Sequence, residues 1–505
     1  MNSISSAKAN RLFLLLNVVL AIAYFICIAF FFPIGNPVLF GLLIGCEVFH
    51  LLQALGYVHT VWPRKHSKEF ETSFSEPVAV YITVTGEPAD IVEATVRGAL
   101  SMEYPAFNVY ILNDGYVANR ENWQEAEEVA LKYGITCITR TTPGGAKAGN
   151  INNALSKTTE PFVVVFDADH IPKSHFLWSL MGYFVDKRVG FVQSPQFYKN
   201  QDQNLVTAGS WEQQELFFGA ILKGKDAINS AFMCGTNMAV RRKALEQVGG
   251  MSEFSIAEDF LTSLLIHQKK WKSVYVDAVL AEGLAPEDFL SYYKQQFRWA
   301  RGSLEVVFKY NPLFRKGLTT NQRIQYLSSA SFYLSGVVVL INALLPLVYF
   351  YSGLQPLTIS TMTLALFFLP YIFIVLYTVQ LTSGFSYTFR ALSFSISSFP
   401  IHLQAIWQII TRKKSGFVVT SKRAIKGNHS YLVTPHIVYI VLVILGVIVG
   451  SLREGLNASI LSNAAWSLVY VFTFIPFIMA AFQKFTPDSN EEIALKPVTK
   501  EVIND

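Results

Sequence analysis

The residues best suited to chemistry follow one apolar strand. Residues 162–166 read FVVVF, an uninterrupted run with three β-branched members, which predicts a strand covered on both faces of a sheet. The run ends at Asp167, Ala168, Asp169 and His170. Carboxylates at the carboxyl end of a core strand stand where open α/β sheets bind ligands. Paired hard oxygen ligands suit Mg²⁺ or Mn²⁺ shared with a phosphate, although an acidic turn is equally typical of a polar loop.

Three further polar groups stand where predicted elements begin or end. Glu87 and Asp114 each follow a predicted strand. Their carboxylates could accept hydrogen bonds from a base or a ribose, or could serve as helix caps and turn residues. Lys147 opens a predicted helix beside a glycine-rich turn, which suits a diphosphate contact. The ending of a Walker motif is missing there.

Residues 232–237, FMCGTN, predict a strand that runs into a bend of small residues near a ligand, with Cys234, Gly235 and Thr236 at the bend. A lone cysteine could be a nucleophile. Because no histidine or other base motif accompanies it, Cys234 is more simply interpreted as a small packing residue.

Two more sets of side chains lie on predicted helices. Glu258 and Asp259 stand at a helix start, where one could cap the helix and one could act as a general base. Gln295, Arg298 and Trp299 share one helix face at spacings of three and four. Arginine suits a diphosphate and an indole suits a sugar face, whereas the same pair is also typical of a membrane interface.

The composition indicates a membrane protein. Of the 505 residues, 51% are hydrophobic and 15% are charged, against roughly 25% charged residues in soluble domains. The net charge of +5 gives no reason to expect nucleic acid, and the four cysteines show neither metal spacing nor a disulfide framework.

Between residues 77 and 283, strand and helix patterns alternate, which predicts an α/β domain with a mostly parallel sheet. Apolar segments before and after it predict about six membrane spans, and basic flanks place the α/β domain and both termini in the cytoplasm. Residues 389–410 are too polar to span and are predicted to lie at the interface. The predicted segments are a membrane hairpin (1–68), the cytosolic domain (69–285), interfacial helices (286–325), a second hairpin (326–381), an interfacial helix with a loop (382–430), a third hairpin (431–483) and a polar cytosolic tail (484–505).

Taken together and in order, these motifs resemble the processive, membrane-integrated family 2 glycosyltransferases, above all the catalytic subunit of bacterial cellulose synthase and related β-glucan synthases. The motifs are Glu87, NDG at 113–115, KAGN at 147–150, DADH at 167–170, FMCGTN at 232–237, AED at 257–259, QQFRW at 295–299 and FVVTSK at 417–422. The last of these matches the family's gating-loop pattern, and the resemblance covers about Pro77 to Lys422.

The resemblance implies a GT-A fold, a UDP-sugar donor and Mg²⁺ or Mn²⁺. It implies nucleotide-sugar contacts from Glu87, Asp114, Lys147, Asp167, Gln295 and Arg298. It implies metal ligands among Asp167, Asp169 and His170, and Asp259 as the base beside Glu258. It implies acceptor contacts from Trp299, Cys234, Gly235 and Thr236, and a gating loop with Phe417, Val419, Thr420 and Lys422.

The implied activity is inverting polymerisation of a β-glucan from UDP-glucose, coupled to export across the plasma membrane. The implied surroundings are membrane lipid, the growing polysaccharide, and an accessory secretion subunit or a homo-oligomer. Three alternatives stay open: a synthase of poly-N-acetylglucosamine or hyaluronan, a non-processive lipid-linked sugar transferase, and a non-catalytic scaffold or transporter.

The sequence departs from the usual cellulose synthase pattern at three places: Ala257 before the acidic pair, TVTGEP at the end of the first strand, and NDG at 113–115. The sugar and the linkage are therefore not fixed by the resemblance. We expect no C-terminal PilZ domain in this chain.

Overall fold

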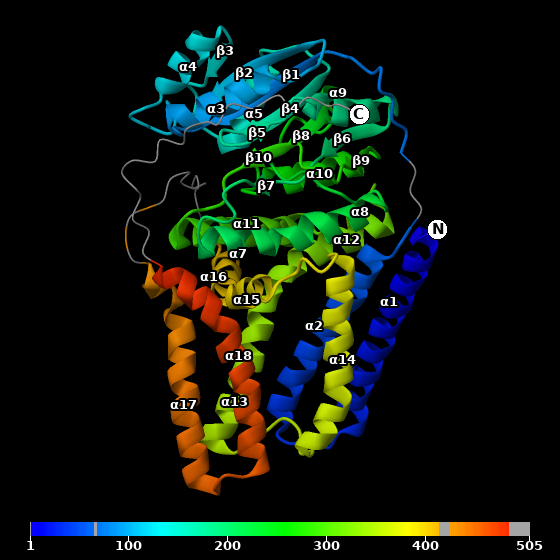
Figure 1. Ribbon diagram of the computed structural model, residues 1–505, viewed down its shortest axis with the longest axis vertical. Coiled ribbons are helices and arrows are strands. Elements are labelled where there is room, and N and C mark those ends of the chain that lie inside the picture. Colours follow the sequence, from blue (N-terminus) through cyan, green and yellow to red (C-terminus); the bar gives the residue numbers. More distant parts are fainter. Residues whose placement is uncertain (1, 65–67, 414–424, 426, 428, 484–505) are drawn as a thin grey trace.

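The computed structural model describes residues 2–64, 68–413, 425, 427 and 429–483. It has an α/β part stacked on a group of long helices, with a layer of helices lying crosswise between them (Figure 1). The predicted combination of an α/β domain and membrane helices is therefore confirmed.

The main sheet of the α/β part has seven strands in the order β3-β2-β1-β4-β8-β6-β9. Every neighbouring pair is parallel except those that involve β8, which runs antiparallel to β4 and β6. A small second sheet has the order β5-β10-β7. The strands are β1 (Val78–Val84), β2 (Phe107–Asn113), β3 (Thr136–Thr139), β4 (Phe162–Asp167), β5 (Ile171–Pro172), β6 (Val189–Gln193), β7 (Phe197–Tyr198), β8 (Met238–Arg241), β9 (Lys272–Tyr275) and β10 (Ala281–Gly283).

Both faces of the main sheet are covered, as the continuous apolar strands predict. In β1, Val80 and Ile82 pack with the helices of one face, whereas Ala79 and Tyr81 pack with those of the other. The first face carries α3 (Ala89–Leu100), α4 (Glu125–Tyr133) and α6 (Phe176–Met181). The second carries α5 (Ala146–Leu155), α9 (Arg242–Glu246) and α10 (Glu258–Gln268).

The crosswise layer connects the sheet to the membrane helices (Figure 1). Its helices are α7 (Leu205–Leu216), α8 (Lys223–Asp226), α11 (Phe289–Tyr310), α12 (Thr320–Ser331), α15 (Phe389–Ser397) and α16 (Phe399–Ile410). The single interfacial helix predicted for 389–410 is thus two helices. The chain breaks at Ser398, and Pro400 stands in the first turn of α16, where its missing N–H costs nothing.

Six helices in the described part of the chain are long and apolar enough to cross a membrane, as predicted. They form two sets. One set packs α1 (Asn2–Ile26), α2 (Pro37–Val61) and α14 (Thr361–Thr382) around one apolar core. The other packs α13 (Ser335–Ser352), α17 (Thr434–Glu454) and α18 (Ala458–Phe482) around another. Phe368 of α14 and Trp466 of α18 meet edge to face, with ring centroids 5.0 Å apart, and join the two sets.

Two local predictions need correction. In the second hairpin, predicted for 326–381, the second helix begins only at Thr361, because the preceding segment pairs with the turn between α1 and α2: Gly35 N donates to Pro356 O over 3.0 Å. The strand predicted to precede the bend at 232–237 instead follows it, as β8. Before the bend, a side chain and not a neighbouring strand satisfies the backbone: Met233 N donates to the Ser263 hydroxyl over 2.8 Å.

Candidate active site

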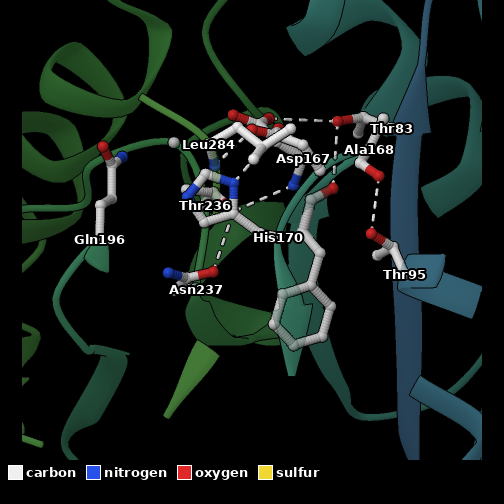
Figure 2. Close-up of polar contacts among 12 residues, drawn as sticks. Thr83, Thr95, Asp167, Ala168, His170, Gln196, Thr236, Asn237 and Leu284 are labelled. Atoms are coloured by element: carbon white, nitrogen blue, oxygen red, sulfur yellow. Dashed lines mark hydrogen bonds and ion pairs between the residues drawn. The ribbon is translucent and has the colours of Figure 1, made fainter. Parts of the chain in front are cut away.

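The acidic turn after β4 is fixed from several directions. Thr83 of β1 donates to Phe166 O over 3.2 Å, and the Thr95 hydroxyl donates to Ala168 O over 2.7 Å. Asp167 N donates to the Thr236 hydroxyl over 3.0 Å, so the bend before β8 holds the turn from the opposite side (Figure 2). These contacts give the two carboxylates of the turn a fixed backbone, which a metal site or a catalytic site requires.

Three side chains of this turn bring ligand atoms together. One atom from each of Asp167, Asp169 and His170 lies within 4.8 Å of the others. Leu284 N donates to Asp169 Oδ2 over 3.1 Å, and His170 Nδ1 lies 3.4 Å from Asp169 Oδ1. The imidazole ring packs on Gly283, where a Cβ atom would lie 2.5 Å from Nε2. Two carboxylates and one imidazole form a donor set that fits Mn²⁺ or Mg²⁺.

Lys147 links this turn to the bend before β8. Its Nζ donates to Asp167 Oδ1 and, over 2.8 Å, to Gly235 O. Gly235 has a φ of +83°, a conformation that favours glycine, and a Cβ atom there would lie 3.1 Å from Asp259 Oδ2. The bend therefore places an ammonium group close to both acidic pairs of the site.

Asp259 stands in the first turn of α10 with its carboxylate facing the bend. Phe260 N donates to Asp259 Oδ1 over 2.7 Å. Burial, and next the neighbouring charge of Glu258, raise the pKa of Asp259 to about 7, and burial also raises the pKa of Glu258. A carboxyl with a pKa near neutrality is suited to accept a proton from a hydroxyl group at physiological pH.

The long crosswise helix α11 presents the third group of predicted residues. Asp288 caps this helix, since Ser291 N donates to its Oδ1 over 2.9 Å. Gln295, Arg298 and Trp299 then line the same cavity as the acidic turn. The shared helix face predicted from their spacing is therefore directed at the site.

Asp114 is placed differently from the other predicted nucleotide contacts. Its two carboxylate oxygens accept from Arg140, Nε to Oδ1 over 2.6 Å and Nη2 to Oδ2 over 2.7 Å. The side chains are only 7% and 8% exposed, and Asp114 does not line the cavity. Sequence reasoning missed Arg140. Arg140 directly follows β3, and it is the pairing of β3 with β2 in the folded sheet that places it opposite Asp114.

We expect Arg140→Leu to lower the free energy of unfolding by about 3–5 kcal/mol, because it leaves Asp114 buried without its cation. The fall in the unfolding temperature of the purified protein, followed by tryptophan fluorescence, measures this. Arg188→Leu is the matched control: Arg188 pairs with Asp186 but is 65% exposed, so its loss should cost about 1 kcal/mol or less. Equal effects of the two substitutions would contradict the structural importance of the buried pair.

The bend before β8 holds the remaining acceptor candidates. Cys234 and Gly235 line the cavity, whereas Thr236 lies behind its wall and supports Asp167. Burial raises the pKa of the Cys234 thiol well above its usual value, in keeping with a packing role. Gln193 of β6 was not predicted, yet its Oε1 accepts from Cys234 N over 2.8 Å and its Nε2 donates to Thr236 O over 2.8 Å.

The predicted gating-loop positions Phe417, Val419, Thr420 and Lys422 lie outside the described residues. The described residues on either side of them contact the α11 helix and its cap. Arg301 Nη2 donates to Lys413 O over 2.7 Å, and Ile425 N donates to Asp288 Oδ2 over 3.0 Å.

A cavity of about 1230 Å³ begins at the acidic turn and Asp259 and continues between the membrane helices. At the sheet end it is lined by residues that include Glu87, Lys147, Asp167, Asp259 and Trp299. Farther along it is lined by all six long helices except α17, and it reaches Ser360 and Ser459 at the far ends of α14 and α18. One space therefore connects the acidic site with the far side of the helical part.

Two family models match the chain. The model described as "Glycosyltransferase like family 2" matches residues 76–302, and the model described as "Cellulose synthase" matches residues 246–482. Cellulose synthase 2 of Novacetimonas hansenii is 30% identical over 426 residues, which is 81% of this chain and 26% of the relative. The cellulose synthase catalytic subunit (UDP-forming) of Xanthomonas axonopodis pv. citri is 34% identical over 58% of this chain and 41% of the relative.

The cellulose synthase 1 catalytic subunit (UDP-forming) of Komagataeibacter xylinus is 30% identical over 80% of this chain and 55% of the relative. The chain thus spans between about a quarter and about half of the length of these relatives. Among solved structures, the mannosyltransferase of Pyrobaculum calidifontis matches with a TM-score of 0.52 at 15% identity, over 74% of this chain and all of the other, which supports a common fold. The α/β part of the chain thus resembles the family 2 glycosyltransferases, and residues 246–482, from the end of the α/β domain through the last membrane helix, resemble the cellulose synthases.

Proposed function

We propose that the protein is a processive, inverting glycosyltransferase that polymerises a β-glucan from UDP-glucose with a divalent metal ion and moves the product across the membrane. The observation that carries this proposal is the single cavity that joins Asp259 and the acidic turn to the far ends of the membrane helices. A transferase that released a short product would not need such a path. The names of the relatives, cellulose synthases that form UDP, support glucose and UDP as the first choice.

The proposed reaction is a direct displacement. Asp259 accepts the proton of the acceptor hydroxyl while the acceptor oxygen forms a bond to the anomeric carbon of the donor sugar. The bond between that carbon and the diphosphate breaks, and UDP leaves with the electron pair. One base and one displacement invert the configuration, so an α-linked donor gives a β-linkage. Trp299 on the cavity wall offers an indole face for the acceptor sugar.

The residues around the departing diphosphate supply positive charge. Lys147 and Arg298 line the cavity beside Asp259 and are proposed to contact the phosphates. Asp167, Asp169 and His170 would hold Mg²⁺ or Mn²⁺, and the ion would neutralise the charge that develops on the leaving group. Asp114 is proposed to act indirectly, because its carboxylate is already paired with Arg140.

The proposed location is the plasma membrane with the α/β domain and both termini in the cytoplasm. The support is the distribution of charge: Arg11 precedes the first span, Arg64 and Lys68 follow the second, and the turn between them at residues 33–36 has no basic residue. This orientation gives the site access to cytoplasmic nucleotide sugars and directs the cavity outward.

The proposal is tested with the purified full-length protein in lipid vesicles, given Mg²⁺ or Mn²⁺ and UDP-glucose, UDP-N-acetylglucosamine or UDP-glucuronic acid one at a time. We expect high-molecular-weight product from UDP-glucose alone, and linkage-specific glucanases then identify the bond. Products of one or two sugars would favour the lipid-linked transferase. Absence of metal-dependent UDP release would favour the non-catalytic alternative.

Activity should depend on pH through Asp259. A carboxyl whose pKa is raised to about 7 is mostly protonated, and so inactive as a base, below that pH. We expect kcat/KM for UDP-glucose to rise about tenfold between pH 6 and pH 8. UDP binding measured over the same range separates this effect from loss of donor affinity. A profile that is flat down to about pH 4, the ordinary carboxyl range, would argue against Asp259 as the base.

A further inference from the structure

Helix α2 presents a stripe of polar side chains to the cavity inside the membrane region. Glu47, His50, Gln53, Tyr57 and Thr60 recur at spacings of three and four, so they share one face of the helix, and all five line the cavity. The stripe extends over about 20 Å of helix. A membrane helix that only contacted lipid or apolar neighbours would not carry such a face.

The partners of the stripe are hydroxyl and amide groups. Gln53 Nε2 donates to the Ser331 hydroxyl over 2.8 Å, and Tyr57 exchanges a hydrogen bond with the Thr382 hydroxyl. Asn17 of α1 lines the same space and is 2% exposed, and its Oδ1 has no hydrogen-bond partner among the described residues. Such a wall suits a ligand that brings its own hydroxyl groups, as a carbohydrate does.

Glu47 adds a carboxylate, and with it negative charge, to this wall. It is 8% exposed, its Oε2 lies 3.5 Å from His50 Nδ1, and it stands near the middle of α2. Among the described cavity-lining residues of the six membrane helices, it is the one aspartate, glutamate, lysine or arginine. A carboxylate can accept hydrogen bonds from sugar hydroxyls, whereas a carboxylate on a passing polymer would meet like charge near the middle of α2, in a poorly solvated space. The described lysines and arginines that line the cavity, Lys147, Lys225 and Arg298, belong to the α/β part and the crosswise helices and not to the six membrane helices.

We propose that the α2 stripe is a charge filter, in which Glu47 admits a neutral, hydroxyl-rich polymer and excludes one that carries carboxylates. This inference rests on the proposed function and narrows it. It favours a neutral hexose polymer, with or without acetamido groups, over a product that contains uronic acid, and so argues against the hyaluronan alternative.

The test compares two probes: short β-linked gluco-oligosaccharides, and the same oligosaccharides after oxidation of their primary hydroxyls to carboxylates. Binding to the full-length protein, cleared of nascent polymer by glucanase, is followed by the fluorescence of the cavity-lining tryptophans Trp299 and Trp466. We expect the wild-type protein to bind the neutral probe at least about tenfold more tightly. Glu47→Gln, which keeps size and hydrogen bonding, should reduce that ratio to about threefold or less.

Two variants complete the test. Glu47→Asp keeps the charge and should keep the wild-type ratio. Glu454→Gln removes a carboxylate at the end of α17 that does not line the cavity, and should leave the ratio unchanged. Equal binding of the two probes to the wild-type protein, or a Glu47→Gln ratio equal to the wild-type ratio, would overturn the filter. Failure of polymer synthesis from UDP-glucose by the wild-type protein would instead defeat the proposed function itself.

Discussion

Asp259→Asn should lower polymer synthesis by about 10²–10⁴-fold, the range that general base catalysis supplies. Asparagine matches aspartate in size and can accept the hydrogen bond from Phe260 N that holds the side chain, but it cannot take a proton from the acceptor. The initial rate of UDP release and the yield of polymer from UDP-glucose measure the effect.

The donor site should survive this substitution. UDP affinity is expected to stay close to the wild-type value, because the proposed phosphate contacts come from Lys147 and Arg298. Asp277→Asn, which removes a half-exposed carboxylate paired with Lys223, is the matched control and should retain activity. Full polymer synthesis by the Asp259→Asn protein would show that another group acts as the base, and Glu258 would be the first candidate.

Asp169→Asn should reduce both metal affinity and polymer synthesis by at least about 10²-fold, because ligands and their supporting contacts each affect such sites strongly. The amide oxygen can still accept from Leu284 N, so the turn is expected to keep its backbone. Titration with Mn²⁺, followed by the paramagnetic resonance of the free ion, reports binding without reference to activity.

Two comparisons sharpen this second result. Glu246→Gln removes an exposed carboxylate from α9 of the same domain and should change neither property. Removal of metal with a chelator should reduce wild-type activity to the level of the Asp169→Asn protein, and added Mn²⁺ should restore only the wild-type. Unchanged Mn²⁺ affinity in the variant would place the metal elsewhere.

Much of the architecture could be predicted because local patterns determine it. The apolar run at 162–166 is the fourth strand, and Lys147 stands in the first turn of a helix, as predicted, whereas its contact with Asp167 was not predicted. The spacing of Gln295, Arg298 and Trp299 predicted one shared helix face, and in the structure all three residues line the cavity. Strand ends of a mostly parallel sheet gather at one edge, so polar residues at those ends converge whatever the details.

What could not be predicted depends on contacts between distant segments. Asp114 was expected on the nucleotide, yet in the described structure its carboxylate is paired with Arg140, which lies 26 positions away. The stripe on α2 was visible only as a single charge in an apolar segment, since its meaning depends on α1, α14 and α18 standing around the same cavity. Pairing of this kind is set by the three-dimensional fold and has no short-range signature.

The grouping of the membrane helices has a consequence for how the chain is made. The set of α1, α2 and α14 is closed by stacked rings of Tyr24 and Tyr371, whose centroids are 4.9 Å apart. The ribosome must add about 300 residues after α2 before α14 begins, which at ordinary rates takes about 15–60 s. For that interval the first hairpin stands in the bilayer without its third helix, with Glu47 on one of its faces. During synthesis, the contacts that close this set, including the Tyr24–Tyr371 stack, therefore form long after the hairpin that they complete.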